Sequence, residues 1–186
     1  MRRLCLVRHG QTDWNSEERF QGQRDVPLNQ KGRLEAHSLA QRLIDISFSA
    51  IYTSDLKRAK ETAEIIAERL HLPITIEPRL REINQGKWEG KSFEVIRNRY
   101  AEQWNQRTID PVNFRPPGGE SIAEVADRVY AAVNDIVNLT PSDFVMIVSH
   151  GLAIATILCK ANGIPIDKAF SHIPENAEPI WVNWLI

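Results

Sequence analysis

The stretch FVMIVSHGLAIATILCKA, residues 144–161, decides the fold class of this chain. Its first six residues are almost all apolar, a pattern typical of a short strand that is buried on both faces of a parallel sheet. The residues from Gly151 to Ala161 are apolar nearly all round and predict a buried helix. A buried strand that leads directly into a buried helix is the repeating unit of an α/β fold.

The rest of the chain repeats this alternation. Further strands are predicted at Arg3–Val7, Phe48–Thr53, Pro73–Ile76 and Ile180–Ile186. Amphipathic helices are predicted over Asp55–Leu70, from the capping box at Ser121–Glu124 onward, and along a first apolar face made by Ala36, Leu39, Ala40, Leu43 and Ile44. The expected architecture is a three-layer α/β/α domain with a mostly parallel central sheet.

Two segments interrupt the pattern. Residues Asp13–Leu28 are polar and are predicted to form a loop. Residues 83–119 are irregular, with one predicted helix over Ser92–Asn105, and are expected to form a lid-like insertion over the sheet. The four large apolar residues at helical spacing in this segment, Phe93, Ile96, Tyr100 and Trp104, are expected to pack the lid onto the domain, while Trp88 is a candidate for lining a cleft.

Length and composition limit the function classes. A chain of 186 residues fits one domain, 1–186, around a single core. The net charge of −1 advertises no basic surface, so no nucleic-acid partner is expected. No apolar run approaches the ~20 residues of a membrane span, so we expect no membrane partner and a cytoplasmic location. Cys5 and Cys159 lie in apolar surroundings and are expected to be buried thiols.

Candidate functional residues follow the predicted strands at one edge of the sheet. Ligands of α/β proteins bind beyond the carboxyl ends of the strands. Arg8 and His9 follow the first strand, Arg58 lies one turn into the helix after the second, and His150 follows residues 144–149. Glu82, at the start of the irregular segment, is expected to reach the same edge.

This set of side chains suits a phosphate group. Arginine offers a planar fork of donors that matches phosphate oxygens, and a neutral histidine can attack phosphorus. A helix that begins at Gly151 would direct its free amide groups at an anion. Metal binding by His9 and His150 is an alternative, but no further cluster with metal-ligand spacing accompanies them, and no metal is expected. His37, His71 and His172 are expected to be structural.

The motif LVRHGQTDWN, residues 6–15, resembles the signature of the histidine phosphatase superfamily, whose members are similar to phosphoglycerate mutases. The similarity continues, in the order typical of that family, through almost the whole chain. The matching segments are FQGQRDVPLN at 20–29, SDLKRA at 54–59, ETA at 61–63, LRE at 80–82, GKWEG at 86–90, PGGES at 117–121 and VSHG at 148–151.

The resemblance implies a role for each candidate residue. It implies that His9 carries the phosphoryl group and that Arg8, Arg58 and His150 neutralise charge on its oxygens. Asn15, Gln21, Gly22 and Gly151 are expected to help hold phosphate. Glu82 is implied as the general acid and base, with no metal and no cofactor.

The resemblance also separates branches of the family. Mutase members follow the acid with an arginine and, two residues later, a tyrosine that hold the phosphoglycerate carboxylate, whereas this chain has Ile83 and Gln85. Mutases also have a longer insertion before the PGG segment, and Gln21 replaces the small hydroxyl residue common in them. These departures favour a phosphomonoesterase acting on a small-molecule phosphate ester, similar to the small bacterial phosphatases.

Three alternatives remain open at this point. The first is a phosphatase specific for α-ribazole phosphate or adenosylcobalamin precursors, the second a phosphoglycerate mutase that depends on bisphosphoglycerate, and the third a non-catalytic module that binds phospho-ligands. A homodimer is an expectation that rests on family likeness alone.

Overall fold

A computed structural model describes residues 2–140 and 144–185. Its sheet has the strand order β3-β2-β4-β1-β5. Every neighbouring pair is parallel except β1 and β5. The strands are β1 (Arg2–Arg8), β2 (Ala50–Thr53), β3 (Ile74–Ile76), β4 (Phe144–Ser149) and β5 (Pro179–Trp184). The predicted mostly parallel sheet is confirmed, and Ile186, the last residue of the predicted final strand, lies outside the described residues.

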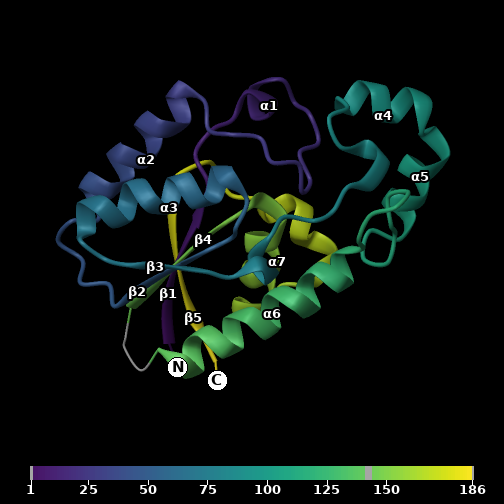
Figure 1. Cartoon of the computed structure of the whole chain (residues 1–186). Coiled ribbons are helices and arrows are strands. Elements are labelled where there is room, and N and C mark those ends of the chain that lie inside the picture. Colours follow the sequence, from purple (N-terminus) through teal and green to yellow (C-terminus); the bar gives the residue numbers. More distant parts are fainter. Residues whose placement is uncertain (1, 141–143, 186) are drawn as a thin grey trace.

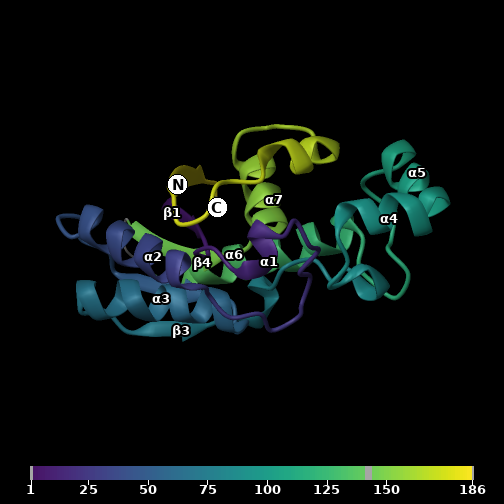
Figure 2. The same cartoon turned by 90° about the horizontal axis from the view of Figure 1, so that it is seen from above.

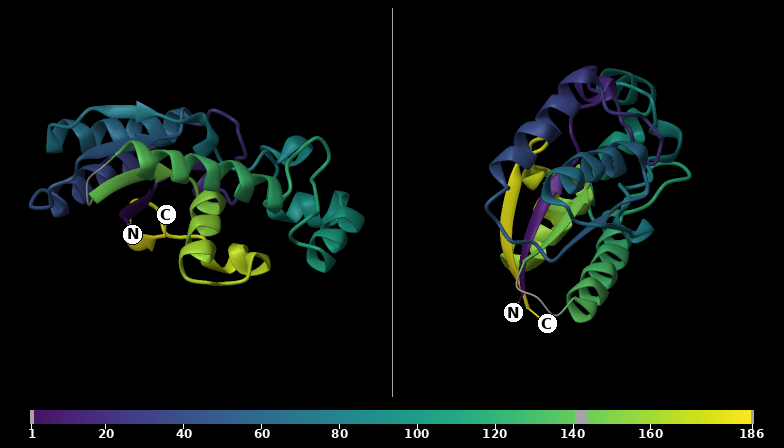
Figure 3. Two further views of the ribbon diagram at one scale, coloured as in Figure 1. Left: turned by 90° about the horizontal axis from the view of Figure 1, so that it is seen from below. Right: turned by 60° about the vertical axis from the view of Figure 1, so that its left-hand side comes forward.

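Helices cover both faces of the sheet. The α-helices are α1 (Asp13–Ser16), α2 (Gln30–Arg42), α3 (Lys57–Leu70), α4 (Phe93–Arg99), α5 (Ala101–Ile109), α6 (Ile122–Leu139) and α7 (Gly151–Ala161). Three 3₁₀ helices, η1 (Pro78–Leu80), η2 (Gly86–Trp88) and η3 (Ile166–His172), lie in the connections. Figure 3 shows α2 and α3 on one side of the sheet and α6 on the other, so the three-layer prediction is confirmed.

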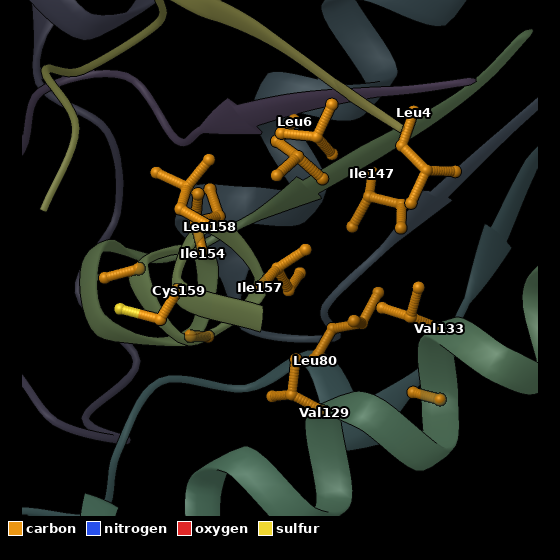
Figure 4. Packing of buried hydrophobic residues seen from close by; sticks show 14 of the residues in the cluster. Leu4, Leu6, Leu80, Val129, Val133, Ile147, Ile154, Ile157, Leu158 and Cys159 are labelled. Carbon is orange, nitrogen blue, oxygen red and sulfur yellow. The ribbon is translucent and has the colours of Figure 1, made fainter. Parts of the chain in front are cut away.

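Successive side chains of the two central strands, β1 and β4, point to opposite faces of the sheet and so divide the core into two halves. Leu4 and Leu6 of β1 pack with Ile147 of β4 against α6 and α7 (Figure 4). Cys5 and Val7, which point the other way, pack against α2 and α3. Because both faces of the two central strands are covered, their buried stretches must be apolar, which explains the uninterrupted apolar runs Leu4–Val7 and Val145–Val148. Burial of the thiol raises the pKa of Cys5 to about 12, as expected for a structural cysteine.

The segment 83–119 projects to one side of the sheet, where α4 and α5 lie (Figures 1 and 2). It is organised around Trp88, whose side chain is fully buried. Around it lie the aromatic rings of Phe20, Tyr100, Trp104 and Phe114. The prediction that Trp88 lines a cleft is therefore wrong, because a large apolar ring was needed as the centre of this small core.

Other boundaries differ from the predicted ones for local reasons. The predicted loop 13–28 contains one short helix, α1, because Thr12 and Asn15 form a capping box. The predicted helix 92–105 is two helices, which break at Tyr100, where φ is −127° and ψ is 37°. Ile44 is 38% exposed and not part of the apolar face, because α2 ends at Arg42 before the side chain can turn inward.

Candidate active site

A cavity of about 400 Å³ opens where β1, β2 and β4 end, between the sheet edge and the segment 83–119. Seven of the nine predicted site residues line it: Arg8, His9, Asn15, Gln21, Gly22, Arg58 and Glu82. His150 lies behind the wall, with its ring 5.2 Å from that of His9, and Gly151 begins α7 beside Arg8 and Glu82. The fold therefore brings together residues that are up to about 140 positions apart in the chain, from 8 to 151.

His9 is 2% exposed, and the contacts of its ring define its protonation. Nδ1 lies 2.8 Å from the carbonyl oxygen of Gly10, which can only accept, so Nδ1 carries the hydrogen. The Nε2 atom accepts a hydrogen bond of 3.2 Å from Arg58 Nε. Burial, and then the charges of Arg58 and Arg8, lower the pKa of His9 well below its usual 6.5. The ring is therefore neutral near neutral pH, with its lone pair on Nε2.

Arg58 is fully buried and is held in place by the loop that precedes it in the chain. Its two terminal nitrogens donate to the carbonyl oxygens of Gly22 (2.8 Å) and Arg24 (2.7 Å). Burial lowers the pKa of Arg58 to about 10, so the guanidinium keeps its charge near neutral pH. Arg8 donates to Pro174 O at 2.8 Å, and its Nε is buried without a partner in the described residues. Two guanidinium groups thus flank His9, and each has N–H groups that are not used in hydrogen bonds to the described residues.

Gly22 and Gly151 lie where a side chain would not fit. Gly22 has φ of +53°, and an added Cβ would collide with the carboxylate of Glu89. An added Cβ at Gly151 would lie 2.9 Å from Ile173 Cγ2 and 3.6 Å from Arg8 Cζ. Both glycines therefore allow the backbone to approach the arginines of the site.

His150 is fully buried, and burial is the main cause that lowers its pKa well below 6.5. Its Nε2 lies 2.9 Å from Ser54 Oγ. Its Nδ1 has no partner in the described part of the chain. If the Ser54 hydroxyl donates to Nε2, Nδ1 carries a hydrogen that is free to reach a ligand.

Glu82 lies at the beginning of α7, opposite the arginines. Its carboxylate oxygens accept from the backbone N–H groups of Leu152 (3.2 Å), Ala153 (3.3 Å) and Ile83 (3.0 Å). The free amides of a helix terminus suit an acidic group at this place. The helix that was expected to face a phosphate thus also orients the predicted acid.

A family model of the histidine phosphatase superfamily (branch 1) matches residues 4–184. The chain belongs to this superfamily. It is 38% identical over 166 residues to a protein from Cronobacter sakazakii named "Probable phosphoglycerate mutase GpmB", covering 89% of this chain and 77% of the relative.

Solved phosphatases share its fold. The mycobacterial glucosyl-3-phosphoglycerate phosphatase in complex with VO3 is 32% identical, with a TM-score of 0.88 over 97% of this chain and 90% of the other. The α-ribazole phosphatase from Shigella flexneri is 26% identical, with a TM-score of 0.89 over 97% and 90% of the two chains.

The remaining predicted residues of this superfamily member differ in how they contribute to the cavity. Asn15 lines the cavity, but its Oδ1 is already used, because it accepts from N and Oγ1 of Thr12. Gln21 lines the cavity with its Oε1 buried and without a partner in the described residues. Phe93, which was expected to pack the lid onto the domain, contacts Phe20 with ring centroids 4.5 Å apart, and its exposed part also lines the cavity. His37, His71 and His172 do not line the cavity.

The position of Glu82 depends on a clamp made by Glu120 and Arg128, which the sequence did not reveal. Arg128 Nη2 donates to the carbonyl oxygen of Glu82 (2.9 Å), and Nη1 donates to the carbonyls of Arg79 and Arg81. Two further bonds, of 2.9 and 3.0 Å, join Arg128 to the Glu120 carboxylate. All five donors of this guanidinium are therefore used, and the backbone that carries Glu82 is fixed.

Two other residues support the site without having been identified as members of it. Thr62 Oγ1 accepts from the backbone N–H of Gly10 (3.0 Å) and donates to Arg58 O (2.7 Å). Asn176 Nδ2 donates to the carbonyl oxygen of His9 (2.7 Å). Thr62 lay within a family motif, whereas Asn176 is near the other end of the chain and only the fold brings it here.

The described residues contain neither a metal-binding cluster nor a membrane-spanning helix. No group of three or more His, Cys, Asp or Glu side chains in residues 2–140 and 144–185 is arranged to hold a metal ion. No helix in that part of the chain is long and apolar enough to cross a membrane.

The buried neutral histidines predict a pH-dependent stability. On unfolding, both rings regain a pKa near 6.5 and take up protons below that pH, so the free energy of unfolding should fall as the pH is lowered through this range. Each ring contributes a slope of up to about 1.4 kcal/mol per pH unit. His150→Asn should reduce the slope, and His37→Asn, at an exposed position of α2, should not. Urea unfolding between about pH 5 and 7 measures it; an unchanged slope in the His150 variant would contradict burial of a neutral ring.

Proposed function

We propose that this protein is a metal-independent phosphomonoesterase that acts on a small phosphorylated metabolite through a phosphohistidine at His9. The observation that carries the proposal is the buried, neutral His9 ring, with its lone pair on Nε2 between two arginines. A neutral imidazole is a nucleophile, and the arginines supply the positive charge that a transferring phosphoryl group needs. No cofactor takes part.

In the first step, the Nε2 lone pair attacks phosphorus and the bond to the ester oxygen breaks. The incoming phosphoryl group displaces Arg58 from Nε2, so Arg58 Nε–H becomes free to donate to a phosphoryl oxygen. In this proposal Arg8 Nε and His150 Nδ1, both buried without partners in the described residues, donate to the phosphoryl oxygens as well. Such donors stabilise the charge on the equatorial oxygens in the transition state.

Glu82 gives a proton to the leaving group in the first step and takes one from water in the second. As a carboxylic acid it gives its proton to the leaving alkoxide, which departs as the alcohol. The resulting carboxylate takes a proton from a water molecule, whose oxygen attacks the phosphohistidine, and the phosphorus–nitrogen bond breaks. Inorganic phosphate leaves, His9 returns to its neutral form and Glu82 is again protonated.

The names of relatives favour a second candidate, a phosphoglycerate mutase, because a protein with that name is 38% identical. The cavity wall supports hydrolysis instead. Ile83 and Gln85 stand where the mutases have an arginine and a tyrosine. Both side chains line the cavity, and the two residues are only 4% and 8% exposed. Neither of these two side chains can make the ion pair with a phosphoglycerate carboxylate that the arginine of the mutases makes.

The test is steady-state phosphate release from a panel of esters in the presence of EDTA. The panel contains α-ribazole phosphate, both phosphoglycerates, sugar phosphates, phosphoserine and p-nitrophenyl phosphate. Release of inorganic phosphate without added bisphosphoglycerate is expected. Interconversion of the phosphoglycerates only when bisphosphoglycerate is present would establish the mutase. Inhibition by EDTA would show that the reaction needs a metal ion. Binding of the esters without turnover would establish a non-catalytic module. A preference of about a hundredfold for α-ribazole phosphate would name the narrower phosphatase.

The clamp on Glu82 predicts the effect of a distant substitution. Arg128→Met removes five hydrogen bonds and leaves the Glu82 carbonyl with the single bond from Gln23 Nε2 (3.1 Å), so Glu82 should lose its fixed position. We expect kcat on alkyl phosphates to fall about tenfold to a hundredfold, with a smaller loss on p-nitrophenyl phosphate, whose leaving group needs little protonation. Arg115→Met, which removes an exposed ion pair with Glu124, is the matched control. Equal losses on both ester types would assign Arg128 a purely structural role.

A further inference from the structure

Arg107 differs from the other arginines that line the cavity, which are Arg8, Arg19 and Arg58. Each of those three donates hydrogen bonds to the protein: Arg8 to Pro174 O, Arg19 to Glu17 and Gly90 O, and Arg58 to Gly22 O and Arg24 O. Arg107, on α5 of the segment 83–119, makes no hydrogen bond or ion pair within residues 2–140 and 144–185.

Two aromatic rings hold the Arg107 guanidinium in place. Its Cζ lies 3.9 Å from the ring centroid of Phe170, on η3, and 4.6 Å from that of Trp104, on α5. Stacking on aromatic faces fixes the plane of the group but uses none of its five N–H donors. Burial lowers its pKa to about 10, which leaves the group positively charged near neutral pH.

The unused N–H groups of Arg107 are accessible, and the side chain lines the cavity, so an anion in the cavity can accept hydrogen bonds from them. The lining of the cavity holds four arginines and two glutamates, so an anion is attracted into it. Because aromatic contacts already orient the guanidinium, little side-chain entropy would be lost when an anion binds to it. A carboxylate or a phosphate, which accepts two parallel hydrogen bonds, is the matching ligand.

We propose that Arg107 binds a second anionic group of the substrate, a carboxylate or phosphate, distant from the scissile ester. This inference rests on the proposed phosphatase function and names its substrate class as phosphomonoesters of metabolites that carry a further negative charge. The ester lies at His9, and the carbon chain contacts the apolar side chains of the wall between the two ends, which include Phe93, Leu152 and Ile173.

The experiment compares ω-carboxyalkyl phosphates of increasing chain length with their primary amides, and adds α,ω-alkanediol bisphosphates as a second arm. The wild-type enzyme should prefer the acid to the amide by at least about tenfold in kcat/KM at one chain length, as for a hydrogen bond to a charged group. Arg107→Gln should abolish this preference and Arg107→Lys should retain part of it. A preference confined to the bisphosphates would assign phosphate as the ligand.

Arg97→Gln is the matched control, because Arg97 also lies over Trp104, at 5.3 Å, but is exposed and does not line the cavity. It should leave the preference unchanged. Hydrolysis of p-nitrophenyl phosphate, which has no second anion, should fall less in Arg107→Gln than hydrolysis of the preferred acid does, and thermal unfolding reports whether the variants fold. A wild-type enzyme without the preference, or an Arg107→Gln variant that keeps it, would overturn the proposal. Failure of the wild type on every ester, p-nitrophenyl phosphate included, would instead contradict the phosphatase function.

Discussion

Replacement of His9 by asparagine should lower kcat by about 10⁴-fold or more, because no other nucleophile in the site can take the phosphoryl group. Asparagine places an amide near the position of Nδ1, so the donor to Gly10 O is retained while the lone pair of Nε2 is lost. The main-chain bonds that hold residue 9, from its N–H to Ser149 O and from Asn176 Nδ2 to its carbonyl, do not depend on the side chain.

The control for His9→Asn is His37→Asn on the exposed face of α2, which should leave kcat unchanged. Steady-state release of phosphate measures both variants, and circular dichroism with thermal unfolding shows that they are folded. A purified His9→Asn protein with more than about one per cent of wild-type activity would refute the role of His9 as nucleophile.

Replacement of Glu82 by glutamine should separate substrates by their leaving groups. Glutamine keeps one oxygen for the amides of Ile83, Leu152 and Ala153, so the segment should stay in place, but it cannot transfer a proton to an alkoxide. Loss of a general acid costs about 10²- to 10⁴-fold, and we expect a loss in this range on alkyl phosphates. On p-nitrophenyl phosphate, whose phenolate leaves without a proton, the first step should change by less than about tenfold.

Glu18→Gln is the matched control, because Glu18 also lines the cavity but is exposed. It removes the same charge from the cavity and should affect both ester types alike. Pre-steady-state release of p-nitrophenolate isolates the first step from the hydrolysis of phosphohistidine. Equal losses on the alkyl and aryl esters in the Glu82 variant would show that Glu82 acts only through its charge.

Local patterns in the sequence were sufficient to predict the layers of the fold and the residues that meet at the carboxyl edge of the sheet. The apolar run 144–149 and the alternation of strands with helices required a covered, mostly parallel sheet. His9 and His150 follow β1 and β4 directly, and Arg58 lies at the start of α3, the helix that follows β2. Because the ends of parallel strands meet at one edge, their positions in the chain were enough to predict that they lie together.

Contacts that depend on side-chain packing between distant segments were not predictable in this way. Trp88 is the centre of a small core because Phe20, from the distant segment 13–28, packs against its ring. The Glu120–Arg128 clamp joins the entry of α6 to a residue two turns along it, and its target is the carbonyl oxygen of Glu82, which has no sequence signature. Arg107 is set apart because it makes no hydrogen bond or ion pair in the described residues and stacks on Trp104 and Phe170, an arrangement that only the three-dimensional structure reveals.

The central claim is that a phosphoryl group resides on His9 during turnover. Acid hydrolyses phosphohistidine, so the wild-type enzyme should be quenched with alkali during steady-state hydrolysis of p-nitrophenyl phosphate. The protein is then digested, and its peptides are analysed by mass spectrometry. The account predicts one phosphoryl group on the peptide that contains His9, attached to Nε2 and lost on brief treatment with acid. An enzyme that turns over at its full rate with the label on another residue, or with no label on any peptide, would contradict it.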